Sequence, residues 1–185
     1  MSRRAFFPIL VAVSWLVAGP SCDRGQPALP VTNRPDGAAR PGVSEVDLEG
    51  MKTAVARRIY VPAYSHILTS DDARPYNLAV TLSVRNTDDV RPIIVRRVHY
   101  HDQDGRLIRD YLKKPLKITP MASIDFFVKE SDTSGGSSAS FLVEWSAEEP
   151  VSEPVVEAVM IGTAGTQGIS FTSPGRVLTR GEPGP

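Results

Sequence analysis

Apolar side chains recur at every second position through the middle of this chain. Leu78, Val80, Leu82 and Val84 alternate with residues that are small or polar, which is the pattern of a β-strand with one buried face. Residues 86–89, Asn-Thr-Asp-Asp, follow with the residue types that favour turns. The dominant period in this part of the chain is therefore two, and the sequence predicts strands there.

The next apolar run changes parity along its length. Ile93 and Val95 fall on one parity, whereas Val98 and Tyr100 fall on the other. Both pairs can stay on one face of a strand only if an extra residue interrupts the alternation. The spacing therefore predicts a β-bulge at Arg96-Arg97.

Further short runs with strand character follow at regular intervals. Residues 102–105, Asp-Gln-Asp-Gly, are expected to close a hairpin with glycine at the turn. The remaining expected strands cover residues 58–66, 107–112, 123–129, 140–146, 155–162 and 169–172. Turn signals come about every 8 to 12 residues, and no clear amphipathic helix follows residues 52–57. This pattern indicates an all-β fold, a single antiparallel β-sandwich of immunoglobulin/fibronectin-like type.

The N-terminus has the layout of a secretory signal peptide over residues 1–21. Two arginines, Arg3 and Arg4, precede an apolar run that ends in Gly-Pro-Ser, and Cys22, the one cysteine of the sequence, follows directly. The apolar run at 5–18 is shorter than the about 20 residues that a membrane-spanning helix needs. A lone cysteine at the cleavage point predicts the lipid-attachment residue of a bacterial lipoprotein.

Two alternatives at this terminus stay open. Gly19 stands where a lipid-attachment motif usually has Leu, Val or Ile, and ordinary cleavage nearby would leave Cys22 as an unmodified thiol. Residues 2–7, Ser-Arg-Arg-Ala-Phe-Phe, also resemble the twin-arginine export motif, although export of the unfolded chain is the default expectation. We expect an exported protein, anchored to the membrane by its N-terminal lipid, with its domain in the periplasm or outside the cell.

Composition divides the rest of the chain into three parts. Residues 22–50 are expected to form a flexible linker rich in proline and glycine, and residues 177–185 a disordered tail. The β-sandwich is expected over residues 51–176, the usual size of one domain. Fully burying each large apolar side chain contributes about 1.5–3 kcal/mol, so a core this rich in them needs no disulfide.

Several long runs of the folded part are together specific enough to resemble a known family. They are Tyr-Val-Pro-Ala-Tyr-Ser at 60–65, Leu-Ser-Val-Arg-Asn-Thr at 82–87, Phe-Leu-Val-Glu-Trp at 141–145, and the stretch 151–176. These runs resemble the bacterial family known as domain of unknown function 3124, over about residues 59–176. The chain departs from that pattern at His101, where the family has tyrosine, and at residues 138–140. The resemblance implies an exported, often lipid-anchored domain without an assigned activity.

No motif of a common enzyme class is present in the sequence. It has no Gly-x-Ser-x-Gly elbow, no P-loop or dinucleotide fingerprint, and no cysteine in the expected domain. Its 21 Lys and Arg residues balance its 21 Asp and Glu residues, which argues against nucleic acid as a partner. We expect a non-catalytic module, without a cofactor, that binds an envelope protein or polymer.

Candidate interaction residues come from three parts of the expected domain. Consecutive glycines in the loop at 132–138 let backbone N–H groups approach a ligand closely, although a flexible connection between strands that needs positive φ is the simpler explanation. Glu144 and Glu157 could form a carboxylate pair for glycoside hydrolysis, and this pair is the remaining catalytic hypothesis. The candidates are Asp132, Gly135, Gly136, Glu144, Trp145, Gln167 and Gly168.

The alternative function is that of a periplasmic protein that binds copper or zinc. His99 and His101 would project from the same face of one strand, at a spacing that can hold such a metal. A third ligand could come from His66 or Asp102. An exposed polar strand face explains the same histidines, so both interpretations stay open.

Overall fold

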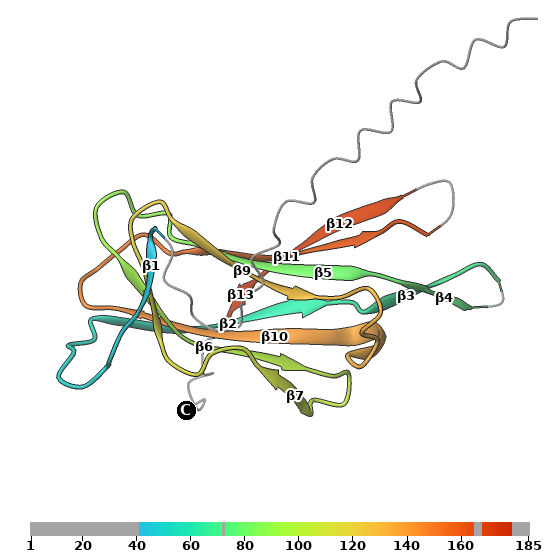
Figure 1. Ribbon diagram of the computed structural model, residues 1–185, viewed down its shortest axis with the longest axis horizontal. Helices are drawn as coiled ribbons and strands as arrows, with labels where there is room; N and C mark the ends of the chain where they lie inside the picture. Colours follow the sequence, from blue (N-terminus) through green and yellow to red (C-terminus); the bar gives the residue numbers. More distant parts are fainter. Residues whose placement is uncertain (1–40, 72, 165–167, 179–185) are drawn as a thin grey trace, which may run out of the picture. The chain divides into compact units, whose positions relative to one another are not determined.

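The computed structural model describes residues 41–71, 73–164 and 168–178 (Figure 1). Over these ranges the chain is all-β, and its strands pair antiparallel. The expected signal peptide, Cys22 and Gln167 lie outside the described residues. Across the same ranges, no helix combines the length and the apolar character needed to cross a membrane.

The strands of the described residues are short to medium in length, and one 3₁₀ turn, η1, precedes β10. In chain order the elements are β1 (Val43–Glu45), β2 (Val55–Ala63), β3 (His66–Thr69), β4 (Arg74–Asn77), β5 (Ala79–Arg85), β6 (Ile93–His101), β7 (Leu107–Asp110), β8 (Leu116–Ile118), β9 (Ser123–Val128), η1 (Gly136–Ser138), β10 (Ala139–Ala147), β11 (Val155–Gly162), β12 (Ile169–Pro174) and β13 (Arg176–Val177).

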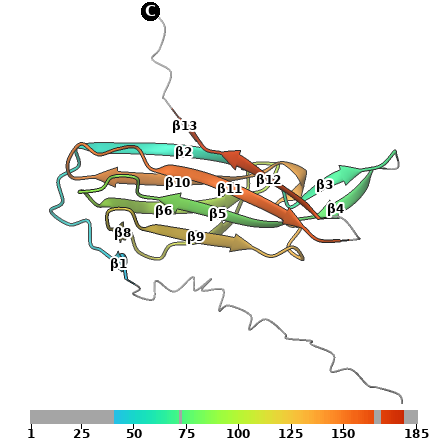
Figure 2. The ribbon, with the colours of Figure 1, turned by 90° about the horizontal axis from the view of Figure 1, so that it is seen from above.

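Two sheets pack face to face. The first sheet has the order β1-β8-β6-β10-β2-β13, with β7 also paired with β6, and the second sheet has the order β12-β11-β5-β9. Figure 1 shows the two layers from the side, and Figure 2 shows them from above. The hairpin β3–β4 extends past the ends of both sheets, where the Tyr76 hydroxyl donates to the Ala164 carbonyl at 2.8 Å. The predicted antiparallel β-sandwich is confirmed.

The core between the sheets consists of the side chains that the period of two selects. The four alternating apolar residues at 78–84 are fully buried. Phe141, Val143 and Trp145 of β10 share the inner face of the first sheet and are buried against them. Alternation in the sequence therefore corresponds directly to the inner and outer faces of the sandwich.

The predicted bulge is present in β6. Glu144 of β10 pairs with Arg97, and the next residue of β10, Trp145, pairs with Val95, so that Arg96 is the extra residue. Arg96 and Arg97 are both exposed, whereas Val95 on one side and Val98 on the other are fully buried. The extra residue thus keeps both halves of the strand facing the core.

The predicted hairpin between β6 and β7 is also present. Gly105 has a φ of +79°, which favours glycine. The Asp102 carboxylate accepts hydrogen bonds from the N–H groups of Asp104 and Arg106, at 2.9 and 2.8 Å. The residues of the turn therefore fix its shape through their own side chains.

The structure contains short strands that the sequence does not predict. β1 lies in the expected linker, yet it pairs with β8 and leaves Val43 only 7% exposed. At the other end, β13 includes Val177 from the expected tail, and the N–H of Leu178 donates to the Arg58 carbonyl at 2.8 Å. Strands of two to four residues are too short to display an alternating pattern. The pairing of the chain thus extends past both limits of the expected 51–176 domain.

Candidate functional site

A row of charged side chains runs across the outer face of the first sheet. Arg58 of β2 pairs with Glu144 of β10, which pairs with Arg97 of β6. Antiparallel partners project from the same side of a sheet. This side is opposite to that of the buried Ile59 and Val143, the next residues along β2 and β10. The row therefore faces away from the core.

A second row on the same face adds aromatic and apolar surface. Tyr60 of β2 pairs with Leu142 of β10 on one side and with Arg176 of β13 on the other. Leu142 in turn pairs with His99 of β6. Tyr60 is 39% exposed, so its ring is available to solvent beside the arginines.

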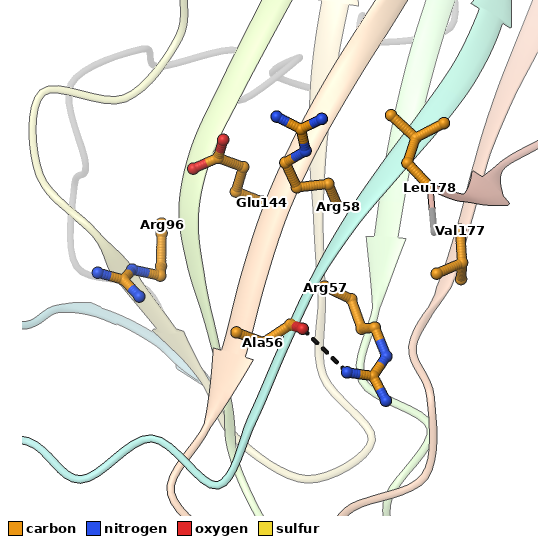
Figure 3. A pocket seen from close by; sticks show the side chains of 7 residues that line it. All are labelled: Ala56, Arg57, Arg58, Arg96, Glu144, Val177 and Leu178. Atoms are coloured by element: carbon orange, nitrogen blue, oxygen red, sulfur yellow. Dashed lines mark hydrogen bonds between the residues drawn. The ribbon is translucent and has the colours of Figure 1, made fainter. Parts of the chain in front are cut away.

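An open hollow of about 760 Å³ adjoins this face (Figure 3). In Figure 3, the arginine side chains around the hollow point in three different directions, so their guanidinium groups do not meet at one point. The hollow is lined by Ala56, Arg57, Arg58, Arg96, Glu144, Val177 and Leu178. Among these described lining residues, three arginines face one carboxylate.

Two of the arginines near the hollow are in ion pairs. Arg97 Nη1 lies 3.4 Å from Glu144 Oε2, and Arg57 Nε lies 3.8 Å from Glu153 Oε1. Arg57 Nη1 also donates to the Ala56 carbonyl at 3.0 Å (Figure 3). These contacts are solvent-exposed, so they contribute little to stability and leave the guanidinium groups accessible.

The other arginines on this face are not in ion pairs with a described carboxylate, although Glu144 is the cross-strand neighbour of Arg58. Within the part of the chain that the structure describes, no carboxylate forms an ion pair with Arg58, Arg96 or Arg176. A guanidinium presents five donors in a planar fork that matches carboxylate and phosphate oxygens. The arrangement can therefore bind anionic groups at several separate points.

The two carboxylates of the catalytic hypothesis lie on different sheets. Glu144 is on the outer face of the first sheet, whereas Glu157 of β11 is on the outer face of the second. Each is close to an arginine, and Glu157 Oε1 lies 3.3 Å from Arg85 Nη2. Because the whole core separates them, they cannot flank one glycosidic bond.

Trp145, a candidate for surface interaction, belongs to the core. It points to the opposite face from Glu144 and is 1% exposed. Its indole Nε1 is buried and has no hydrogen-bond partner among the described residues. Its large apolar surface therefore stabilises the sandwich rather than a complex.

The glycine loop is packed against one end of the core. The Gly135 carbonyl accepts a hydrogen bond from the Gln103 N–H at 3.1 Å, and the Gly136 carbonyl accepts one from the Ser65 N–H at 3.1 Å. Gly135 is buried, and a Cβ there would overlap the Tyr100 hydroxyl. Gly136 has a φ of +74°. These glycines thus allow close packing and the geometry of the turn, as expected for a loop that connects two strands.

Asp132, in the same loop, forms hydrogen bonds with side chains of the domain itself. Burial alone would raise the pKa of its carboxyl, but hydrogen bonds from Ser134 and the Arg109 guanidinium lower the pKa below its usual value. Arg109 Nη2 lies 2.9 Å from Asp132 Oδ2, and Arg109 Nη1 also donates to the Tyr111 hydroxyl at 3.2 Å. This ionised side chain thus joins the loop to β7.

Gly168 stands apart from these groups, directly before β12. It is exposed, and the nearest atom to an added Cβ would be the Gly162 carbonyl oxygen at 3.5 Å. The described candidates therefore lie in three separate regions, which are β10, the glycine loop and the residue before β12. Of the described ones, only Glu144 lines the hollow.

His99 and His101 share one face of β6, as the spacing predicts. Their ring centroids are 5.8 Å apart, and His99 Nε2 lies 3.4 Å from Asp110 Oδ2. Burial lowers the pKa of His101, the neighbouring His99 lowers it further, and Asp102 opposes both effects. Over residues 41–71, 73–164 and 168–178, no three His, Cys, Asp or Glu side chains gather as a metal site would require. His66, on β3, therefore does not complete a three-histidine site.

The arginines and Tyr60 are the surface residues that the sequence interpretation missed. A signal for part of them exists, because Arg58 and Tyr60 occupy the opposite parity to the buried Ile59 and Val61. Arg176, by contrast, joins them through β13, which has only two residues. Parity could place the first two on an outer face but could not bring Arg176 beside them.

Comparison with known proteins gives a family and a distant structural neighbour. Residues 56–178 match the model of a family described as "Protein of unknown function (DUF3124)". No curated protein matches the chain. A solved structure titled "Crystal Structure of Thermotoga maritima 1070" is similar at a TM-score of 0.40 and 14% identity, covering 66% of this chain and 95% of that one.

Proposed function

The chain belongs to the family of proteins of unknown function DUF3124, and from that premise we propose that it is an exported, lipid-anchored, non-catalytic module that binds an envelope protein or polymer. The binding surface is the outer face of the first sheet, from β13 across β2 and β10 to β6. The membrane contact is the lipid on Cys22, and nucleic acid is not the partner.

The arginines without an ion pair carry this proposal. Arg58 and Arg96 line an open hollow and form no ion pair with a described carboxylate, although the chain as a whole has equal numbers of acidic and basic residues. Exposed charges that are not needed for internal ion pairs are free to recognise a partner of opposite charge.

A non-catalytic role is supported by the positions of the acidic candidates. Glu144 and Glu157 lie on different sheets, and Asp132 is engaged with Ser134 and Arg109. The metal alternative keeps only the pair His99 and His101, with a carboxylate 3.4 Å from His99. Two imidazoles without a third defined ligand are a weak basis for copper or zinc.

Site-specific cross-linking in cells tests the binding surface. A photoreactive residue replaces Tyr60 on the outer face of the first sheet or, as the matched control, Ile161, which is 46% exposed on the second. We expect cross-linked adducts from position 60, and their loss when Arg58→Glu is added. Adducts from position 161 alone would show that the proposed face is not the binding surface.

A further inference from the structure

We propose that the outer face of the first sheet binds an acidic polysaccharide that runs across the strands. The anionic groups of the polymer contact Arg176, Arg58 and Arg96, and one sugar ring stacks on Tyr60. This inference rests on the proposed function, because it names the ligand of the same surface.

The arginines suit an extended ligand better than a small one. They lie on β13, β2 and β6, and only β10 separates β2 from β6. Neighbouring strands are about 4.8 Å apart, so the cations are spread over about 14 Å of the sheet. Around the hollow, Figure 3 shows Arg57, Arg58 and Arg96 pointing away from one another. A single small anion would contact one of them, whereas a polymer can contact them in turn.

The surface between the cations suits sugar rings. Tyr60 is 39% exposed and lies between Arg176 and Leu142 in the ladder, with Arg58 two residues away on the same face. A tyrosine ring offers a flat apolar surface together with a polar hydroxyl at its edge. The apolar face of a sugar can stack on this ring while its acidic substituents reach the guanidinium groups.

A recessed surface favours a chain over a membrane. Arg58 and Arg96 are exposed but line an open hollow, which a polymer chain can follow and a planar layer of lipid headgroups cannot. An acidic protein segment could also satisfy the arginines, but it would not require the exposed ring of Tyr60. Substitution of Tyr60 therefore distinguishes an acidic polysaccharide from an acidic protein segment experimentally.

Binding of the full chain, purified in detergent, to four probes tests the inference. The probes are polygalacturonate, neutral dextran, poly-glutamate and phosphatidylglycerol vesicles. We expect the tightest binding to polygalacturonate, weakened by added salt, and no binding to dextran. The double variant Arg58→Glu, Arg96→Glu should bind polygalacturonate at least about tenfold more weakly, as expected for lost charge-assisted hydrogen bonds.

Matched variants distinguish the loss of contacts at this surface from a change in net charge and from a loss of folding. Arg106→Glu with Lys113→Glu changes the net charge equally at exposed positions outside the surface, and should leave binding unchanged. Tyr60→Ala should weaken binding to polygalacturonate about threefold to tenfold and leave any binding to poly-glutamate unchanged. Arg58→Gln with Arg96→Gln, checked for an unchanged unfolding midpoint, covers the case in which the charge reversal does not fold.

Each other outcome overturns the inference. Equal binding to poly-glutamate that is insensitive to Tyr60→Ala would indicate an acidic protein, and preferential binding to vesicles would indicate a membrane surface. If either occurs while position 60 still cross-links in cells, the proposed binding function stands and only the ligand class is wrong. If neither the probes nor the cells give binding at this face, both proposals are wrong.

Discussion

At the scale of single residues, Asp88 is a buried carboxylate whose partners are all backbone N–H groups. It is 7% exposed, and it accepts hydrogen bonds from Ser152 at 2.9 Å, Arg91 at 2.7 Å and Val90 at 3.0 Å. Those bonds, with Ser152 contributing most, lower the pKa of its carboxyl. Hydrogen bonds to the charged form of a carboxyl favour its ionisation. The ionised side chain thus connects the β5–β6 turn to the segment before β11.

Replacing this carboxylate should make the protein less stable and less sensitive to acid. An unfolded aspartate titrates near 3.8, and the folded pKa lies lower, so the stabilisation is fully present above 3.8 and is lost as the pH falls through the folded pKa. Asp88→Asn should therefore lower the free energy of unfolding at pH 7, with a difference from wild type that narrows below about pH 3.8. Denaturant titrations of Asp88→Asn and wild type, at pH 7 and at a pH below about 3.8, measure this difference in the free energy of unfolding.

The adjacent Asp89→Asn is the matched control, because Asp89 is exposed. It should leave stability near that of the wild type at both pH values. A difference between Asp88→Asn and wild type that stays constant with pH would mean that the lost stability does not come from the ionised carboxylate.

At the scale of elements, the bulge in β6 determines which side chains reach the outer face. Arg96 is the extra residue, and it lines the hollow, while Val95 and Val98 stay in the core. A bulge re-aims side chains without changing the faces of the strand on either side of it. One inserted residue thus supplies a cation to the surface and preserves the packing.

Deletion of Arg96 should therefore leave the fold intact. Without it, Val95 and Val98 would be separated by one outward residue, which is ordinary strand alternation. Deletion of Thr81 from β5, between the buried Val80 and Leu82, should unfold the protein, because a shift of one residue moves the following apolar side chains to the wrong face. Circular dichroism and tryptophan fluorescence during thermal unfolding compare the two. Equal loss of structure in both deletions would show that the bulge is required for folding.

At the scale of the whole molecule, the two outer faces of the sandwich differ in character. The first sheet presents Arg58, Arg96 and Arg176 to solvent, whereas β11 and β12 of the second sheet present Val159, Ile161 and Thr172. A neutral chain can therefore have one strongly basic surface.

The proposed lipid anchor on Cys22 predicts a specific change in cell fractionation. A bacterial lipoprotein generally carries three acyl chains on its cysteine, and three chains bind a membrane far more strongly than one, since each buried methylene contributes about 0.8 kcal/mol. The full chain should incorporate labelled palmitate and sediment with membranes, and Cys22→Ser should lose both properties. A protein that never incorporates palmitate, and whose Cys22→Ser variant still fractionates with membranes, would disprove the anchor.

Much of the fold was predictable because the relevant information is local. The alternation at 78–84 placed one strand and its buried face, the change of parity around Arg96 placed the bulge, and residues 102–105 placed a hairpin. In each case neighbouring residues alone decide the backbone geometry and the side of the strand that is apolar. The short strand β1 could not be predicted in this way, because it is defined by its partner β8.

The sequence by itself determined the longer strands, which of their faces are buried, and the turns at 86–89 and 102–105. Only the tertiary structure decided that Arg58, Arg96 and Arg176 lie on one surface, and that Glu157 lies on the opposite one. The physical reason is that strand order depends on how distant segments pack their apolar faces together. Alternation within a segment specifies its inner side, but not which strands become its neighbours.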